Sequence, residues 1–243
     1  MSENRCFHTP EMTAFVRFRD RRDAGRQLAR LLMPYRAEHP LVLGLPRGGV
    51  VVAYEIARAL QAPLDVIVAR KIGAPQQPEL AIGAVAPGGV VFFYPYALRA
   101  LGISPERARQ LAAREQQELE RRIRRYRGDQ PMPDVTGRTV IVVDDGLATG
   151  ATALAAVRAL RRQHPRRIVL AAGVCAPETA AALEPEVDDL VCVAMPEDFV
   201  AVGQWYEDFR PVTDEEVIAL LEDARRWSAP DAEQSPDTPD SSS

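Results

Sequence analysis

Two adjacent acids and the Gly/Thr loop behind them have the residue types and spacing best suited to chemistry in this chain. The segment from Thr139 to Thr152 reads TVIVVDDGLATGAT, so the acids follow an apolar, β-branched run directly. Glycines let the backbone approach a ligand, and loop amides followed by a helix N-terminus attract an anion. The segment predicts a phosphate cradle made of Asp144, Asp145, Gly146, Leu147, Ala148, Thr149, Gly150 and Thr152.

This loop differs from the two commonest nucleotide-binding patterns. No lysine follows its second glycine, as a Walker A loop requires, and it lacks the GxGxxG spacing. Thr149 and Thr152 would donate hydrogen bonds from their hydroxyls to a phosphate. Asp144 and Asp145 would accept hydrogen bonds from vicinal hydroxyls of a sugar ring and hold a cation nearby. The ligand that suits both halves of the segment is a ribose 5-phosphate.

Four segments, this loop among them, together make a family resemblance. VIVVDDGLATGAT resembles the 5-phosphoribosyl-1-diphosphate (PRPP) binding motif of the type I phosphoribosyltransferases. LGLPRGGV, from Leu43 to Val50, resembles the pyrophosphate-binding loop of that family, and RKIG, from Arg70, resembles the start of its flexible catalytic loop. The order of GLPRGG, RKIGAP, VDDGLATGAT and VGQWYEDF, over about residues 15–226, is similar to a bacterial branch of the family.

The resemblance implies an enzyme that moves the 5-phosphoribosyl group of PRPP to a nitrogenous base or related acceptor and releases pyrophosphate. Negative charge developing on the pyrophosphate would be stabilised by Mg²⁺, by Arg70 and Lys71, and by the backbone amides of Arg47, Gly48 and Gly49. With Asp144 and Asp145, Arg70 and Lys71 are the candidate catalytic residues. The alternatives are two solvated cations at a strand end and a plain glycine turn.

Two other segments carry weaker candidates. Residues 73–83 (GAPQQPELAIG) fit either a mobile lid that excludes water or a passive loop. In the VGQWYEDF segment, Trp205 or Tyr206 could stack on a planar base, although such aromatics are more often part of a core. Asp208 resembles the acid that helps to hold a second cation in purine members of the family, which gives Asp144, Asp145 and Asp208 as metal candidates.

The acceptor stays open, because the chain departs from one subgroup of the family. In 6-oxopurine transferases an acid stands three positions after the acid pair and assists proton transfer at the purine. Here that position is Ala148. A role in hypoxanthine or guanine salvage is therefore not expected, and another group must move the proton or the acceptor is not a purine.

Short apolar strands alternating with helices must position these residues. The pattern predicts strands over 41–45, 64–69, 139–143, 168–172 and 189–193, and helices over 50–60, 151–163 and 177–183. This is the rhythm of an α/β fold with a doubly wound, mainly parallel sheet, whose ligands bind at the carboxyl ends of the strands. Ser104 and Pro105 start a long charged helix that runs to about Tyr126.

Residues 1–227 are expected to form one phosphoribosyltransferase-like domain, and residues 228–243, rich in Ser, Pro and Asp, a disordered tail. The family resemblance implies a small hood built from the residues before 41 and after 195. The chain contains 47% hydrophobic residues and 26% charged residues, which is ordinary globular usage. It shows no apolar run long enough to span a membrane and no signal peptide, so we expect a cytoplasmic protein.

The partners expected are PRPP and a small-molecule acceptor. A net charge of −4 gives no general case for a nucleic-acid partner. The runner-up function is a PRPP-binding regulator that contacts RNA or a protein partner through the arginines at the end of the long helix. A hydrolase on a similar scaffold is a third alternative, which no GxSxG or HExxH motif supports. A homodimer stays open, because nothing in the sequence fixes an interface. The arginines of the cluster are Arg121, Arg122, Arg124, Arg125 and Arg127.

Overall fold

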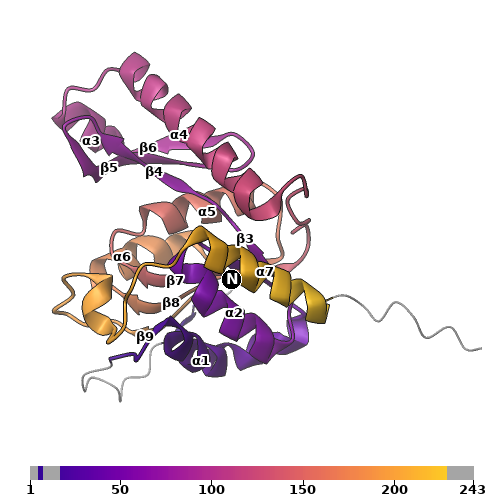
Figure 1. The fold of residues 1–243 in the computed structure, drawn as a ribbon. Helices are drawn as coiled ribbons and strands as arrows, with labels where there is room; N and C mark the ends of the chain where they lie inside the picture. Colours follow the sequence, from indigo (N-terminus) through magenta and orange to yellow (C-terminus); the bar gives the residue numbers. More distant parts are fainter. Residues whose placement is uncertain (1–4, 8–16, 229–243) are drawn as a thin grey trace, which may run out of the picture.

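A six-stranded parallel sheet forms the centre of the molecule (Figure 1). The computed structural model describes residues 5–7 and 17–228. The strands lie in the order β1-β9-β8-β7-β2-β3, and every neighbouring pair is parallel. The strands are β1 (Arg5–Phe7), β2 (Leu41–Gly44), β3 (Leu64–Val66), β7 (Thr139–Leu147), β8 (Arg167–Cys175) and β9 (Asp189–Ala194).

All five strands predicted from the sequence are present, with changed ends. β3 stops at Val66, three residues earlier than predicted. β7 continues to Leu147, so both acids and Gly146 still belong to the strand, where the sequence predicts a loop. β7 is longer than predicted because β8 pairs with it as far as Leu147 and Cys175. The acids are therefore held in the sheet itself.

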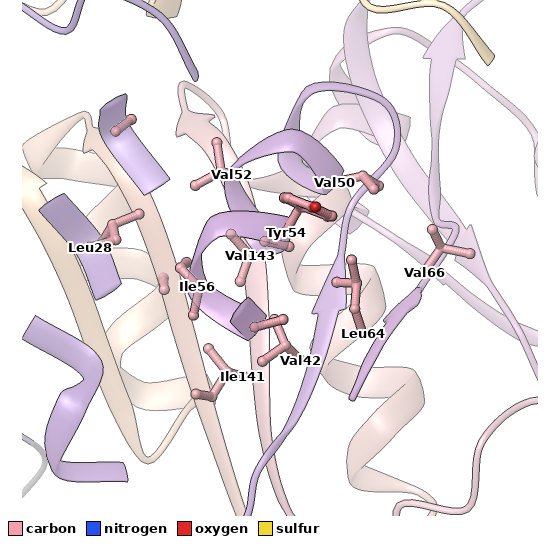
Figure 2. Packing of buried hydrophobic residues seen from close by; sticks show 14 of the residues in the cluster. Leu28, Val42, Val50, Val52, Tyr54, Ile56, Leu64, Val66, Ile141 and Val143 are labelled. Atoms are coloured by element: carbon pink, nitrogen blue, oxygen red, sulfur yellow. The ribbon is translucent and has the colours of Figure 1, made fainter. Parts of the chain in front are cut away.

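Helices cover both faces of this sheet, as a doubly wound fold requires. Val42, Ile141 and Val143 pack on the face covered by α1 and α2, where Figure 2 shows them beneath the side chains of α2. Their neighbours Leu43 and Val142 point the other way and pack against α5 and α6. Buried strands with two apolar faces are typical of parallel sheets. The helices are α1 (Arg21–Leu32), α2 (Gly48–Leu60), α5 (Ala151–Arg161) and α6 (Pro177–Leu183).

An arm inserted between β3 and β7 carries a second, antiparallel sheet (Figure 1). The segment at 73–83 is not an irregular loop, because most of it belongs to paired strands; its role as a lid stays a prediction. The α4 and α5 helices both contact these strands. The arm consists of β4 (Arg70–Ala74), β5 (Gln77–Ala86), β6 (Val90–Phe93), α3 (Pro95–Ala100) and α4 (Pro105–Arg127).

The charged helix α4 begins where the sequence predicts, with the Ser104 hydroxyl accepting a hydrogen bond from the Arg107 amide at 3.1 Å. Most arginines near its end form ion pairs with acidic side chains of the protein itself. Arg125 forms ion pairs with Asp214 and Glu215, and the buried Arg127 forms one with Asp65 of β3. Both Arg121 and Arg122 bond Glu118. These contacts favour a structural role for the cluster over a nucleic-acid surface.

The C-terminal segment packs against the start of α1 and over α2. It contains η3 (Val202–Trp205) and α7 (Asp214–Ser228), and α7 contacts α2. Two shorter turns, η1 (Met33–Glu38) and η2 (Glu184–Glu186), follow α1 and α6. The Phe18 amide donates to the Trp205 carbonyl at 2.8 Å, and the Glu207 amide donates back to the Phe18 carbonyl at 2.8 Å. The two segments expected to form a hood are thus joined.

The predicted division into a domain, hood and tail stays a prediction, and residues 229–243 lie outside the described part. Cys175 and Cys192 are both buried. Among the helices of residues 17–228, none has the length and apolar character needed to cross a membrane.

Candidate active site

The acid pair stands at the carboxyl end of β7, near the middle of the parallel sheet. Asp144 lies opposite Ala172 of β8, and the Asp145 amide donates to Oδ1 of Asp144 at 2.8 Å. On the other side, β2 ends at Gly44 and leads into α2. This is the strand edge at which open α/β sheets bind their ligands.

The start of α2 packs directly on the acids, because Gly48 and Gly49 have no side chains. A Cβ added to Gly48 would collide with Oδ2 of Asp145, and one added to Gly49 would lie 2.5 Å from the Val143 carbonyl oxygen and 2.9 Å from Asp144 Cα. The sequence predicts a glycine turn here, whereas both glycines already belong to the helix, with Arg47 as its N-cap. The predicted pyrophosphate loop and the predicted sugar-binding acids are therefore neighbours.

The phosphate loop leads from β7 into α5. Ala148 and Thr149 are exposed, and Gly150 has φ +66°, a left-handed conformation that glycine adopts without strain. The Thr179 hydroxyl of α6 donates to the Ala148 carbonyl at 2.5 Å and holds the loop in place. Among the described residues, no side chain caps the first turn of α5. Its amides are therefore available to donate hydrogen bonds to an anion, as a phosphate cradle requires.

Arg21 is the functional candidate that sequence reasoning missed. Its Nε donates to Oδ2 of Asp145 at 2.6 Å, its Nη1 donates to the Arg210 carbonyl at 2.9 Å, and its Cζ lies 3.9 Å from the centre of the Phe209 ring. The side chains of Arg21 and Asp145 are 10% and 15% exposed. The only signal in the sequence is that Arg21 follows Asp20, which caps α1 by accepting from the Asp23 amide at 2.8 Å.

Burial and the charges of the acid pair raise the pKa values of two groups at this site. Burial and the negative charge of Asp145 raise the pKa of Asp144 well above its usual value, and Arg21 opposes this shift. The Tyr206 hydroxyl donates to the main-chain carbonyl of Asp145 at 2.6 Å. Burial, followed by the charge of Asp145, raises the pKa of Tyr206 well above its usual value. Tyr206 therefore remains a neutral donor.

The aromatic pair occupies the core and not an open ligand surface. Tyr206 is 2% exposed, and its ring packs against Phe18 and Phe209 with centroid separations of 5.1 and 5.0 Å. Trp205 is also buried, at 8% exposure. The structure thus favours the core alternative for both residues and corrects the expectation that they stack on a base. The Tyr206 ring packs at the junction between the two chain segments instead.

The predicted pair Arg70 and Lys71 is divided between two faces of β4. Arg70 pairs in register with Val85 on the face of α4, where its Nε donates to Glu115 Oε2 at 2.7 Å. Lys71 pairs in register with Ala84, which packs in the same cluster as the α5 side chains. Directly opposite residues of an antiparallel pair share a face. The structure therefore makes Arg70 an anchor of the arm through Glu115 of α4, and it assigns Lys71 to the opposite face of β4.

The metal candidates are not gathered into a cage. Arg21 occupies one oxygen of Asp145, and the Asp208 side chain is 51% exposed and accepts from the Arg210 amide at 3.1 Å. Within residues 5–7 and 17–228, no three His, Cys, Asp or Glu side chains cluster in a way that could hold a metal ion. These side chains do not fit a Mg²⁺ ion held by the protein alone.

Comparisons with known proteins agree with this arrangement. Residues 20–209 match a family model described as the phosphoribosyl transferase domain. The crystal structure of TT1426 from Thermus thermophilus is 47% identical, covers 88% of this chain and all of its own, and superimposes with a TM-score of 0.74.

Two proteins of Mycobacterium tuberculosis, from strains CDC 1551 and H37Rv, are each 44% identical over 209 residues, or 86% of this chain. Both are named provisionally as phosphoribosyl transferases. The chain spans about half of their length, 47%.

Proposed function

The chain belongs to the phosphoribosyl transferase domain family, and on that premise we propose that it transfers the 5-phosphoribosyl group of PRPP to a nitrogenous base or related acceptor, with release of pyrophosphate. One observation carries the proposal. The N-terminal ends of two helices, α2 and α5, flank the carboxyl end of a strand that bears two adjacent acids. A ligand with two anionic ends and a polyhydroxyl centre matches that arrangement.

The two anionic ends of PRPP suit the two helix N-termini. The loop from Leu147 to Thr152 would hold the 5-phosphate, because the amides at the start of α5 carry a partial positive charge and have no capping side chain among the described residues. The amides of Arg47, Gly48 and Gly49 would hold the diphosphate. These donors are fixed by the fold before substrate arrives, which is the condition for electrostatic stabilisation of a transition state.

The acid pair would bind the ribose between these ends. Asp144 and Asp145 would accept hydrogen bonds from the ring hydroxyls, which places C1 of the sugar next to the start of α2. As the bond to pyrophosphate breaks, positive charge develops on the sugar and negative charge on the leaving group. The carboxylates of the two acids would stabilise the positive charge on the sugar. Lys71 and the amides of α2 would stabilise the negative charge on the leaving group.

We keep Mg²⁺ as part of the proposal only as an ion that the substrate brings. Magnesium usually retains several waters and is bound through one or two carboxylates together with substrate phosphates. Of the acid pair, Asp145 has one oxygen paired with Arg21, so we assign Asp144 to such an ion and the second oxygen of Asp145 to the ribose. When bound, it would neutralise charge on the diphosphate.

The side chain at position 148 restricts the chemistry of the acceptor. Position 148, where 6-oxopurine transferases carry an acid, holds an exposed alanine, so the loop offers no general base. Either the acceptor nitrogen has a low pKa or a group elsewhere takes its proton.

Isothermal titration with PRPP, with and without Mg²⁺, tests the proposal. We expect the wild type to bind, and Asp145→Asn and Asp144→Asn to lose about 10- to 100-fold in affinity, since hydrogen bonds to charged groups contribute roughly 1.5–3 kcal/mol. Asp129→Asn, an exposed acid just past α4, is the matched control and should bind normally. A pyrophosphate-release screen across purine, pyrimidine and pyridine bases then seeks the acceptor. Absence of PRPP binding by the wild type at millimolar concentration would overturn the proposal.

A further inference from the structure

Beyond the acids themselves, we propose that Arg21 is the residue that positions Asp145 for the sugar, by holding one carboxylate oxygen so that the other faces a ribose hydroxyl. This inference rests on the proposed function, because it concerns the same ribose site. It assigns a role to a residue that lies 124 positions away from Asp145 in the chain.

The guanidinium of Arg21 is held on three sides. Nε bonds Oδ2 of Asp145 at 2.6 Å, Nη1 bonds the Arg210 carbonyl at 2.9 Å, and the Phe209 ring lies against Cζ at 3.9 Å. A cation on an aromatic face and a charge-assisted hydrogen bond both have restricted geometry. With 10% of its side chain exposed, Arg21 has little freedom to leave this position.

The carboxylate of Asp145 is held on both sides by its neighbours. Its Oδ2 accepts from Arg21, and the carboxyl group also interacts with the adjacent carboxyl group of Asp144. The main-chain carbonyl of Asp145 is fixed separately by the Tyr206 hydroxyl at 2.6 Å. A carboxylate with its backbone and one oxygen fixed presents the other oxygen in a single direction, which is how an acceptor is preorganised for a hydroxyl.

Arg21 also supplies the positive charge that two adjacent acids need. Asp144 and Asp145 would repel each other without a counter-ion, and the described side chains form no metal cage that could supply one. Gly48 makes the arrangement possible, because an added Cβ there would lie 2.6 Å from Nε of Arg21. The pair is therefore built into the contact between α1, α2 and β7.

The test is a comparison of sugar phosphates that differ by one hydroxyl. Ribose 5-phosphate, 2-deoxyribose 5-phosphate and 3-deoxyribose 5-phosphate are titrated calorimetrically against the wild type, Arg21→Gln, Arg21→Lys and the control Arg19→Gln. Arg19 is a suitable control, since it precedes α1 and its side chain is 71% exposed. Thermal unfolding of each variant reports whether it is folded, and Arg21→Lys keeps the charge if Arg21→Gln does not fold.

We expect the wild type and Arg19→Gln to prefer ribose 5-phosphate over both deoxy sugars by roughly tenfold or more. In Arg21→Gln the preference over one deoxy sugar should disappear while the preference over the other remains, because only one acid has lost its orientation. Arg21→Lys should be intermediate.

Loss of affinity for all three ligands by the same factor would show a structural role and overturn the inference, as would an unchanged preference. If the wild type binds neither ribose 5-phosphate nor PRPP, that result overturns the proposed function instead.

Discussion

Gly48→Ala is the smallest change that reaches the acid pair, because it adds one methyl group to α2. The added Cβ would meet the Asp145 carboxylate and lie 2.6 Å from Nε of Arg21, both far ends of side chains. Asp145 Cγ, 2.7 Å from that Cβ, would have to retreat by about 0.7 Å to reach the 3.4 Å of ordinary contact. Oδ2 must move further, so its bond to Arg21 breaks.

The expected effect is large on binding and small on stability. A displacement of about 1 Å in a binding residue can cost about 100-fold, so we expect affinity for ribose 5-phosphate and PRPP to fall by roughly 10- to 100-fold. Stability is affected in both directions. Breaking the partly buried ion pair destabilises the fold, whereas alanine in place of glycine stabilises a helix by about 0.5–1 kcal/mol. We expect the Tm to change by no more than roughly 4 °C.

Gly49→Ala is the matched comparison, because its Cβ would meet main-chain atoms. It would lie 2.5 Å from the Val143 carbonyl oxygen and 2.9 Å from Asp144 Cα, so α2 must move away from β7. We expect it to lose about 1–3 kcal/mol of stability, in the range of an overpacked core. Calorimetric titration and thermal unfolding of both variants decide the matter. If Gly48→Ala binds ribose 5-phosphate like the wild type, the acid pair does not hold the sugar in the orientation seen here.

Three further outcomes are expected. Lys71→Gln should slow pyrophosphate release at least tenfold with unchanged ribose 5-phosphate affinity, while Arg70→Gln should keep that rate and lose about 1 kcal/mol of stability. Equal rates in the two variants would contradict the division of β4. Burial, and then the bond to Asp214, raise the pKa of Tyr126 to about 12. Its neutral form is thus favoured in the fold, and stability present below pH 10 is lost as pH rises toward 12. In urea unfolding, the wild type should lose about 1.3 kcal/mol more than Tyr126→Phe between pH 9 and 11; parallel losses would refute this. Arg127→Met should lose about 3 kcal/mol by stranding its acidic partner, and adding Asp65→Leu should restore most of it; no recovery would refute the pairing.

The sequence was sufficient for those parts of the fold that depend on local pattern. Strands such as 139–143 are β-branched and apolar, and the cap at Ser104 lies just before the helix it starts, so both could be identified from neighbouring residues. The hairpin at 73–83 was missed because its glycines and prolines are typical of loops. It becomes a strand pair because α4 and α5 enclose it, and α4 begins some twenty residues later in the chain.

The candidate site divides in the same way. Asp144 and Asp145 could be found because they are adjacent and precede a glycine loop. Arg21 could not, since its partner lies 124 residues away and an arginine on an amphipathic helix has the pattern of a solvated side chain. Tyr206 was assigned to a ligand platform because composition does not reveal burial. Its true place depends on packing between Phe18 and Phe209, which only the folded chain shows.

The insertion of the arm between β3 and β7 has a consequence for how the molecule folds. Gly44 of β2 and Val143 of β7 are sheet neighbours, yet the whole arm separates them along the chain. Closing so long a loop costs entropy before any contact compensates for it, and parallel pairings of this kind form slowly. The arm has local, antiparallel contacts and can form early. In refolding followed by pulsed hydrogen exchange, the amides of β4 and β5 should gain protection before those of β7, which makes assembly of the acid pair a late event.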